Sequence, residues 1–155
     1  MSALSDCHKA GVLLVVSEPT SEQHLKDFHN WYDTEHGPAR LRLGEEFFQN
    51  GIRYKERDGR KWLAIYDMKR LSAGSEPRYT ILRERRSIRE QEVLREKVNV
   101  LSRQFLATVF DSTHITEVAQ SLVVATFEVN RGEEETIKRW YSEVKVFSGC
   151  TRTNC

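Results

Sequence analysis

The sequence predicts an α+β domain with the element order β-α-β-β-α-β. Two patterns carry this prediction: an apolar run at residues 11–17, typical of a buried strand, and two further strands within residues 50–68 that are joined by a turn. A segment with helical periodicity follows each of them, and a last strand is expected at residues 105–110. This order is the split-βαβ, or ferredoxin-like, arrangement. A partial second β-α unit is expected to follow it.

The composition bounds the class of protein and its partners. Of the 155 residues, 39% are hydrophobic and 30% are charged, which is typical of soluble globular proteins. The formal net charge is +1, so electrostatics favour no nucleic acid as a partner. The longest apolar run, residues 11–16, is too short to span a bilayer, so no membrane partner is expected.

The cysteines and the N-terminus indicate the compartment. Three cysteines, Cys7, Cys150 and Cys155, form an odd set near the two ends, which argues against a disulfide framework. The first residues lack the basic-then-apolar order of a signal peptide. We therefore expect a cytoplasmic protein.

Four parts are expected along the chain: a tail at 1–10, the ferredoxin-like unit at 11–112, an incomplete second repeat at 121–146 and a tail at 147–155. The repeat is indicated by an ungapped internal similarity, in which Leu13-Leu14-Val15 aligns with Leu122-Val123-Val124 and Trp31-Tyr32 aligns with Trp140-Tyr141. A strand at 122–129 and a helix at 133–144 are predicted there. Lysines stand where the first copy has its two histidines, so only the scaffold is repeated.

The first helix is expected to begin soon after Pro19, which ends the first strand. Thr20 and Gln23 form a capping-box pair, in which the hydroxyl and the amide each serve backbone groups at a helix start. Gly37-Pro38 is expected to end this helix, because proline has no N–H to donate to the helical ladder.

The segment at 50–68 predicts a β-hairpin. Asp58-Gly59 is expected to supply the positive φ angles of a tight turn. A turn centred there sets the pairing register, and the register decides which side chains lie on the same face of the hairpin. One face would carry Ile52, Tyr54, Leu63 and Ile65, and the other would carry Arg53, Lys55, Trp62, Ala64 and Tyr66.

A second, long helix is expected from Ser75 to about Ser102, with Ser75 as its cap and Pro77 in its first turn. The spacing predicts an inward stripe of Tyr79, Leu82, Arg86, Val93, Leu94, Val98 and Leu101. Arginines and glutamates alternate along residues 83–97, which is typical of a solvated helix face.

The candidate chemistry lies in residues 28–38, which combine two histidines with large aromatics and carboxylates. Helical spacing places four residues on one face, namely Leu25, His29, Tyr32 and His36. A histidine in such a place can give or take a proton near neutral pH. A histidine among apolar neighbours is also common as a structural residue, and the spacing leaves both interpretations open.

The sequence gives little support for a metal site or a cofactor site. His29 and His36 would lie about 10.5 Å apart along a helix axis, too far to share one ion. The chain has no HxxxH or CxxC pair, no G-x-S-x-G, and no glycine-rich nucleotide motif. We therefore expect no metal and no cofactor.

Several other residues are candidates for ligand contacts. Tyr54 and Tyr66 alternate with apolar residues on strands, where a phenol either packs in the core or serves a polar ligand group. Arg40 and Arg42 could hold a carboxylate or a phenolate, although ordinary loop charges are the favoured interpretation. Glu35 either orients His36 or solvates the helix end, and the second is favoured.

A motif in this segment resembles one of a known family. The pattern W-Y-x-x-E-H-x-P, here Trp31, Tyr32, Glu35, His36 and Pro38, is similar to the end of the first helix in the EthD-like branch of the dimeric α/β-barrel superfamily. Residues 51–54 and 61–67 also resemble the hairpin of fungal proteins of this group. The resemblance covers roughly residues 11–112 as a full unit and 121–146 as a partial one.

This resemblance implies a homodimer in which two sheets pack together, and a pocket between sheet and helices. Such proteins include cofactor-independent decarboxylases, cyclases and isomerases of secondary metabolism that act on polyketide or aromatic substrates. His36 matches the family histidine and would transfer the proton. Substrate contacts are expected from His29, Trp31, Tyr32, Tyr54 and Tyr66.

Two alternatives remain open beside this enzyme. One is a non-catalytic barrel that binds a hydrophobic ligand or supports a partner, which the incomplete second repeat favours. The other is a haem-binding barrel that uses His29 or His36, because other members of the superfamily bind haem.

Overall fold

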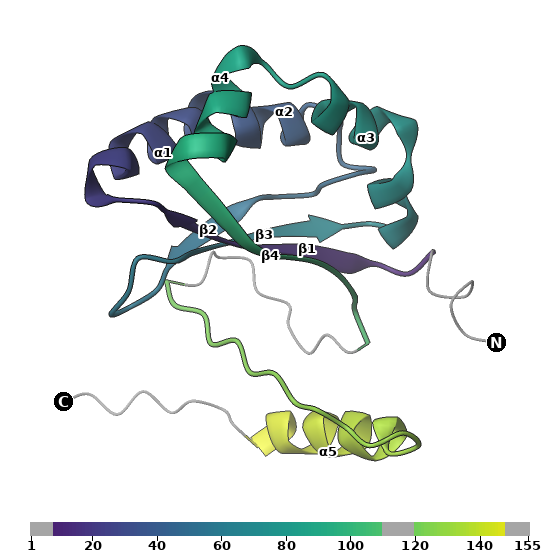
Figure 1. Ribbon diagram of the computed structural model, residues 1–155. Helices are drawn as coiled ribbons and strands as arrows, with labels where there is room; N and C mark the ends of the chain where they lie inside the picture. Colours follow the sequence, from purple (N-terminus) through teal and green to yellow (C-terminus); the bar gives the residue numbers. More distant parts are fainter. Residues whose placement is uncertain (1–7, 110–119, 148–155) are drawn as a thin grey trace. The chain divides into compact units, whose positions relative to one another are not determined.

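The computed structural model describes residues 8–109 and 120–147 (Figure 1). The chain divides into two units, Met1–Thr108 and Val109–Cys155, and each is described by itself. All three cysteines lie outside the described residues, so their expected lack of pairing stays a prediction. Within the described ranges, no helix is both long and apolar enough to cross a membrane.

The first unit alternates strands with helices. Its strands are β1 (Gly11–Pro19), β2 (Ile52–Lys55), β3 (Trp62–Met68) and β4 (Val98–Ala107). Its α-helices are α1 (Leu25–Trp31), α2 (Gly37–Leu41), α3 (Pro77–Glu84) and α4 (Ile88–Glu92). Two short 3-10 helices, η1 (Glu22–His24) and η3 (Leu71–Ser75), lie between these elements. Two π-helical turns, η2 (Tyr32–His36) and η4 (Val93–Lys97), follow α1 and α4.

The strands of the first unit form one antiparallel sheet in the order β2-β3-β1-β4. The central strand β1 is the apolar run of the sequence, and it pairs with β3 on one side and β4 on the other. Figure 1 shows the four helices of this unit on one face of the sheet. This is the ferredoxin-like fold, so the predicted fold class is confirmed.

The core lies between the sheet and the helices. Leu13 and Phe28 are fully buried, and Trp31 is 2% exposed. The remaining members come from both layers: Tyr32, Phe47, Phe48, Ala64, Tyr66, Met68, Ala73, Tyr79, Val93 and Val98. Burying one large apolar side chain stabilises a fold by about 1.5–3 kcal/mol. The aromatic helix α1 is therefore a major contributor to the stability of this unit.

The register of the hairpin is as predicted, but its turn is not. Ile52 pairs with Ile65 and Tyr54 with Leu63, which leaves Arg53 opposite Ala64 on the other face. The turn is closed by the Glu56 N–H, which donates to the Lys61 carbonyl at 2.9 Å. Gly59 has no positive φ angle. The loop is therefore longer than a two-residue turn, and a longer loop can reverse the chain without left-handed residues.

The first helix does not end at Gly37-Pro38, as the sequence predicted. Helical structure continues to Leu41 and ends near Gly44, whose φ of +96° suits glycine. A π-turn at η2 precedes Pro38, and in it the Gly37 N–H donates to the Tyr32 carbonyl five residues back. Pro38 then occupies the first turn of α2, where its missing N–H is not needed.

The predicted capping box is also absent. Ser21, not Thr20, precedes the first helical turn, and it makes no side-chain cap. The Thr20 hydroxyl lies 2.7 Å from His24 Nδ1 and 3.1 Å from the Glu96 carbonyl. Thr20 thus connects β1 to the end of η4.

The long second helix is divided. Pro77 begins α3 as expected, with Glu76 rather than Ser75 at the cap position. Ser87 caps a new helix, because its Oγ accepts the Glu90 N–H at 3.0 Å. Helical structure stops at Lys97, and Val98 begins β4 opposite Pro19. The predicted strand at 105–110 therefore begins earlier, and Phe110 lies outside the described residues.

The face of the sheet away from the helices is apolar along its centre. Val12, Leu14 and Val16 alternate along β1 with the core residues of that strand. Leu14 pairs with Ile65 and Val16 with Leu63, which places these side chains together on that face. All five are partly exposed.

The second unit contains α5 (Glu134–Phe147), which confirms the predicted helix. Residues 121–130 form no strand, so the one predicted at 122–129 is not observed. A strand needs a hydrogen-bonded neighbour, and no strand of the described residues pairs with this segment. Phe127 contacts Trp140 at 6.2 Å between ring centroids. Whether this unit repeats the first stays a prediction.

Candidate functional site

A half-open cavity of about 310 Å³ lies in the first unit, against α1, α2 and the first half of β4. Its wall is apolar over much of its area, through Val15, Phe28, Trp31, Leu94, Val98 and Val100. Its polar wall consists of Ser17, Tyr32, His36, Arg40, Arg83, Arg86 and Arg103. The volume falls at the lower end of the range of small-molecule pockets.

His36 lines this cavity from the last position of the π-turn η2. Its ring packs on Trp31, with 4.2 Å between ring centroids, and near Tyr32 at 5.0 Å. His29 does not line the cavity, so the predicted common face of His29 and His36 is not observed.

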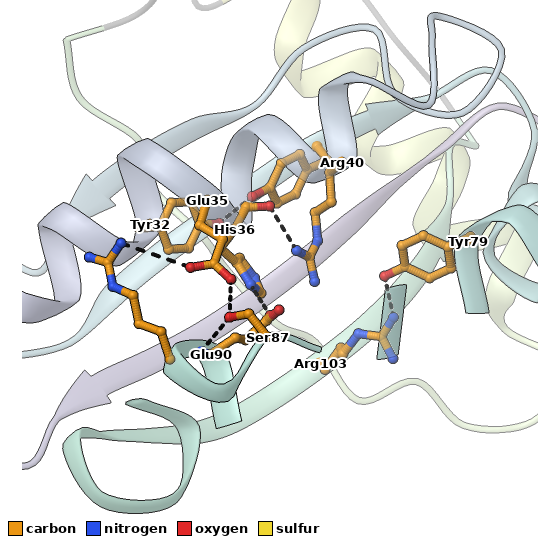
Figure 2. Close-up of polar contacts among 10 residues, drawn as sticks. Tyr32, Glu35, His36, Arg40, Tyr79, Ser87, Glu90 and Arg103 are labelled. Carbon is orange, nitrogen blue, oxygen red and sulfur yellow. Dashed lines mark hydrogen bonds and ion pairs between the residues drawn. The ribbon is translucent and has the colours of Figure 1, made fainter. Parts of the chain in front are cut away.

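Glu90 holds the imidazole of His36. The His36 Nδ1 lies 2.8 Å from Glu90 Oε1, and each side chain is 13% exposed (Figure 2). Glu90 stands in the first turn of α4, where the Ser87 cap holds its backbone. The Ser87 hydroxyl in turn donates to Glu35 of the η2 turn. This contact ties the start of α4 to the segment that carries His36.

The electrostatics keep His36 neutral at physiological pH. Burial lowers its pKa to about 4, although the hydrogen bond with Glu90 acts in the opposite direction. Burial acts to raise the pKa of Glu90, but the contact with His36 and the nearby arginines lower it below its ordinary value. A neutral imidazole beside a carboxylate donates its Nδ1–H to it. The Nε2 atom then carries the free lone pair.

Tyr32 and Tyr66 form a buried pair of phenols. Their hydroxyl groups hydrogen-bond each other, and Tyr66 is 2% exposed. Burial raises the pKa of both groups, so both remain protonated at neutral pH. The guanidinium group of Arg53 lies over the Tyr32 ring at 4.2 Å. Tyr32 lines the cavity, whereas Tyr66 supports it from behind.

His29 contacts the hairpin instead of the cavity. Its Nδ1 accepts a hydrogen bond from Arg53 Nη1 at 3.3 Å, and its ring packs edge-on against Trp62 at 4.5 Å. Burial lowers the pKa of His29, and the charge of Arg53 adds to this effect. His29 therefore joins α1 to the hairpin and does not line the cavity.

Of the other predicted contacts, the structure brings Trp31, Tyr32 and His36 together and leaves Tyr54 apart. Tyr54 is on the opposite face of the sheet from Tyr66, as the hairpin register requires, and it does not line this cavity, so its substrate contact stays a prediction. Arg40 is not an ordinary loop charge, because it lies in α2 and lines the cavity. Its Nη1 donates to the His36 carbonyl at 3.0 Å.

The partner of His36 escaped the sequence analysis, because Glu90 fell within what was interpreted as a solvated helix face. Arg86, by contrast, was placed on the inward stripe of the second helix, and it does line the cavity. The signal that could have located Glu90 is Ser87-Ile-Arg-Glu90, which has the spacing of a capping box and marks a helix start. Glu35, by contrast, contacts Ser87 and not the imidazole. Within the described residues, no group of three or more metal-ligating side chains occurs.

Comparisons with known proteins give fold-level similarities. No protein family profile and no curated protein matches this chain. The solved structure of Rv0793 from Mycobacterium tuberculosis is similar at 16% identity, with a TM-score of 0.44, and covers 66% of this chain and 99% of that one. A dimeric ferredoxin-like protein from an uncultured marine organism is similar at 14% identity, with a TM-score of 0.48, and covers 72% of this chain and 100% of that one.

Proposed function

We propose that this protein is a cofactor-independent enzyme in which His36 acts as the general base. The observation that supports it is the 2.8 Å contact between His36 Nδ1 and Glu90 Oε1 at the wall of a half-open cavity. The carboxylate orients the ring and leaves Nε2 free to take a proton. This is the arrangement that proton abstraction from carbon or oxygen needs.

The substrate is a planar molecule with an apolar ring surface and an enolisable or phenolic centre. Trp31 and Phe28 offer flat aromatic surfaces to such a ring. The arginines of the wall offer positive charge to the enolate or phenolate that proton transfer produces. The reaction is a decarboxylation, a cyclisation or an isomerisation, and all three pass through such an anion.

The resemblance of the Trp31-to-Pro38 segment to EthD-like proteins supports a polyketide-like or aromatic substrate and a place in secondary metabolism. Three cysteines, an odd number, support a reducing compartment such as the cytoplasm.

The test is proton exchange on a small ketone. Purified protein is incubated with 2-tetralone in D₂O, and NMR follows the loss of the α-proton signal. The wild type is expected to accelerate exchange, and His36→Ala to reduce the rate by about 10²–10⁴-fold. His29→Ala is the matched control, because it removes a histidine of the same helix that does not line the cavity.

Two outcomes would overturn the proposal. In one, His36→Ala exchanges the proton as fast as the wild type. In the other, the wild type binds 2-tetralone without accelerating exchange, which points to a binding protein. A haemin titration tests the remaining alternative, since a Soret band that depends on His36 would indicate haem ligation.

We further propose a homodimer that forms through the apolar face of the sheet. Leu14, Ile65 and their neighbours present partly exposed apolar side chains on that face. Contiguous apolar surface of this kind is typical of an interface. The marine protein above is described as dimeric, which agrees with this proposal.

A further inference from the structure

The cavity that contains His36 has an unusual balance of charge. Four arginines belong to its wall, namely Arg40, Arg83, Arg86 and Arg103. No aspartate or glutamate among the described residues lines it. The electrostatic potential inside is therefore positive, and it favours an anionic occupant.

The arginines of this unit differ in their pairing. Six that lie outside the cavity wall form ion pairs with carboxylates: Arg53 with Asp33, Arg60 with Glu18, Arg70 with Glu76, Arg78 with Glu46, Arg89 with Glu35 and Arg95 with Glu96. Arg42, Arg57 and Arg85 form no ion pair with a described carboxylate. No carboxylate of the described residues forms an ion pair with any of the four in the cavity wall.

The partners that the cavity arginines do have are neutral. Arg40 donates to the His36 backbone carbonyl, and Arg103 donates to the Tyr79 hydroxyl (Figure 2). Glu90 is close enough to feel the charges of Arg40 and Arg86, but its Oε1 is engaged by His36. Positive charge in the wall therefore remains available to a ligand.

Two donors at the same site lack acceptors. Trp31 Nε1 and Arg40 Nε are shielded from solvent and have no hydrogen-bond partner in the described part of the chain. Both side chains belong to the cavity wall, and a buried donor without an acceptor destabilises a fold. Trp62 Nε1 is also unpaired, but Trp62 lies outside the cavity wall.

We propose that the cavity binds an aromatic carboxylate. Its ring would pack on the apolar wall formed by Phe28, Trp31 and Leu94, and its carboxylate would accept hydrogen bonds from the arginines. A guanidinium group matches a carboxylate geometrically and pairs with it through two parallel hydrogen bonds. This inference rests on the proposed function, because it names the substrate class on which His36 would act.

Calorimetric binding at low ionic strength tests the inference with three probes: 1-naphthoate, its neutral isostere 1-naphthamide, and inorganic phosphate. We expect 1-naphthoate to bind at least about tenfold more tightly than the amide, because a hydrogen bond to a charged group contributes that much. Added salt should weaken the binding of the carboxylate but not that of the amide.

Substitution of single arginines identifies which positive charges bind the carboxylate. Arg86→Gln and Arg103→Gln should each reduce the affinity for 1-naphthoate toward that of 1-naphthamide. Arg95→Gln is the matched control, since Arg95 lies in η4, is paired with Glu96 and does not line the cavity. If either variant does not fold, Arg83→Gln replaces it, because Arg83 is exposed at the rim.

The inference is overturned if 1-naphthoate and 1-naphthamide bind equally, or if the preference survives these arginine substitutions. It is also overturned if phosphate binds with the same dependence on arginine and 1-naphthoate does not compete, which would indicate an inorganic oxyanion site.

An independent signal comes from His36 itself. A bound anion should raise the pKa of His36 from about 4, which NMR of the imidazole protons can follow.

The two proposals fail separately. Proton exchange uses a neutral ketone and responds to His36, whereas the carboxylate preference responds to the arginines. If His36→Ala keeps the preference for 1-naphthoate but the wild type exchanges no proton, the binding site stands and the proposed enzyme does not. If exchange depends on His36 but no preference exists, the enzyme stands and the substrate class is wrong.

Discussion

His36 and Glu90 are 54 positions apart in the chain, yet His36 Nδ1 and Glu90 Oε1 lie 2.8 Å apart. The contact joins the π-turn after α1 to the first turn of α4, and it is supported by the bond from Ser87 to Glu35. This contact fixes the tautomer of the His36 imidazole, with the proton on Nδ1.

Replacing Glu90 by glutamine should weaken His36 as a base without removing it. The glutamine is nearly isosteric, but it no longer supplies the negative charge that favours a protonated ring. The pKa of His36 should therefore fall below about 4, and the 2-tetralone exchange rate should decrease by about 10- to 100-fold. Glu92→Gln, an exposed neighbour that pairs with Lys97, is the control. Wild-type exchange in Glu90→Gln would contradict the orienting role.

The stability of the protein should fall as the pH decreases from about 6.5 to about 4. Burial lowers the pKa of His36 from its ordinary 6.5 to about 4, so the unfolded chain binds the proton first in this window. Protonation of the unfolded state then reduces the free energy of unfolding, by up to about 3 kcal/mol from this residue. Above the window both states are neutral, and the contribution no longer depends on pH.

Urea denaturation at several pH values measures this slope. His36→Gln should flatten it, whereas the wild type should keep it. His29 has a lowered pKa as well and contributes with the same sign, so His29→Gln shows how much of the slope belongs elsewhere. The groups that face His36 are Glu90, Arg40 and Arg86. An equal slope in the wild type and in His36→Gln would count against the burial of a neutral imidazole.

The hydroxyl groups of Tyr32 and Tyr66 should stabilise the fold as a pair. Removing one by Tyr32→Phe or Tyr66→Phe leaves the other buried without its partner, at a cost of about 1–3 kcal/mol. The double variant should lose less than the sum of the single losses, because it leaves no unpaired hydroxyl. A double-mutant cycle by urea denaturation measures this coupling. Strictly additive losses would show that the two hydroxyls do not interact.

A charge on the open sheet face should separate the proposed dimer. Ile65→Glu places a carboxylate within apolar surface that a partner would cover, and burying an unpaired charge is costly. Size-exclusion chromatography with light scattering should show a dimer for the wild type and a monomer for the variant. Ile88→Glu is the matched control, because Ile88 is 87% exposed on α4. A monomeric wild type would refute the dimer.

Local patterns in the chain were sufficient for the fold class. Alternation of apolar residues on β1 and the hairpin, and helical spacing after each of them, depend only on neighbours in sequence. The same patterns correctly indicated the register of Tyr54 and Leu63, because in a hairpin the turn sets the pairing. Helical spacing placed Tyr32 and His36 on one face, and the family resemblance added Trp31; these three residues do meet at one cavity.

Long-range packing decided the rest. Whether Gly37-Pro38 ends a helix depends on the π-turn that precedes it, and a wider turn is stable only when tertiary contacts support it. Val98 forms a strand rather than a helix because β1 offers it hydrogen bonds, and intrinsic helix preference is weak against such pairing. The partnership of His36 with Glu90, and the cavity position of Arg86, both require two segments that only the folded chain brings together.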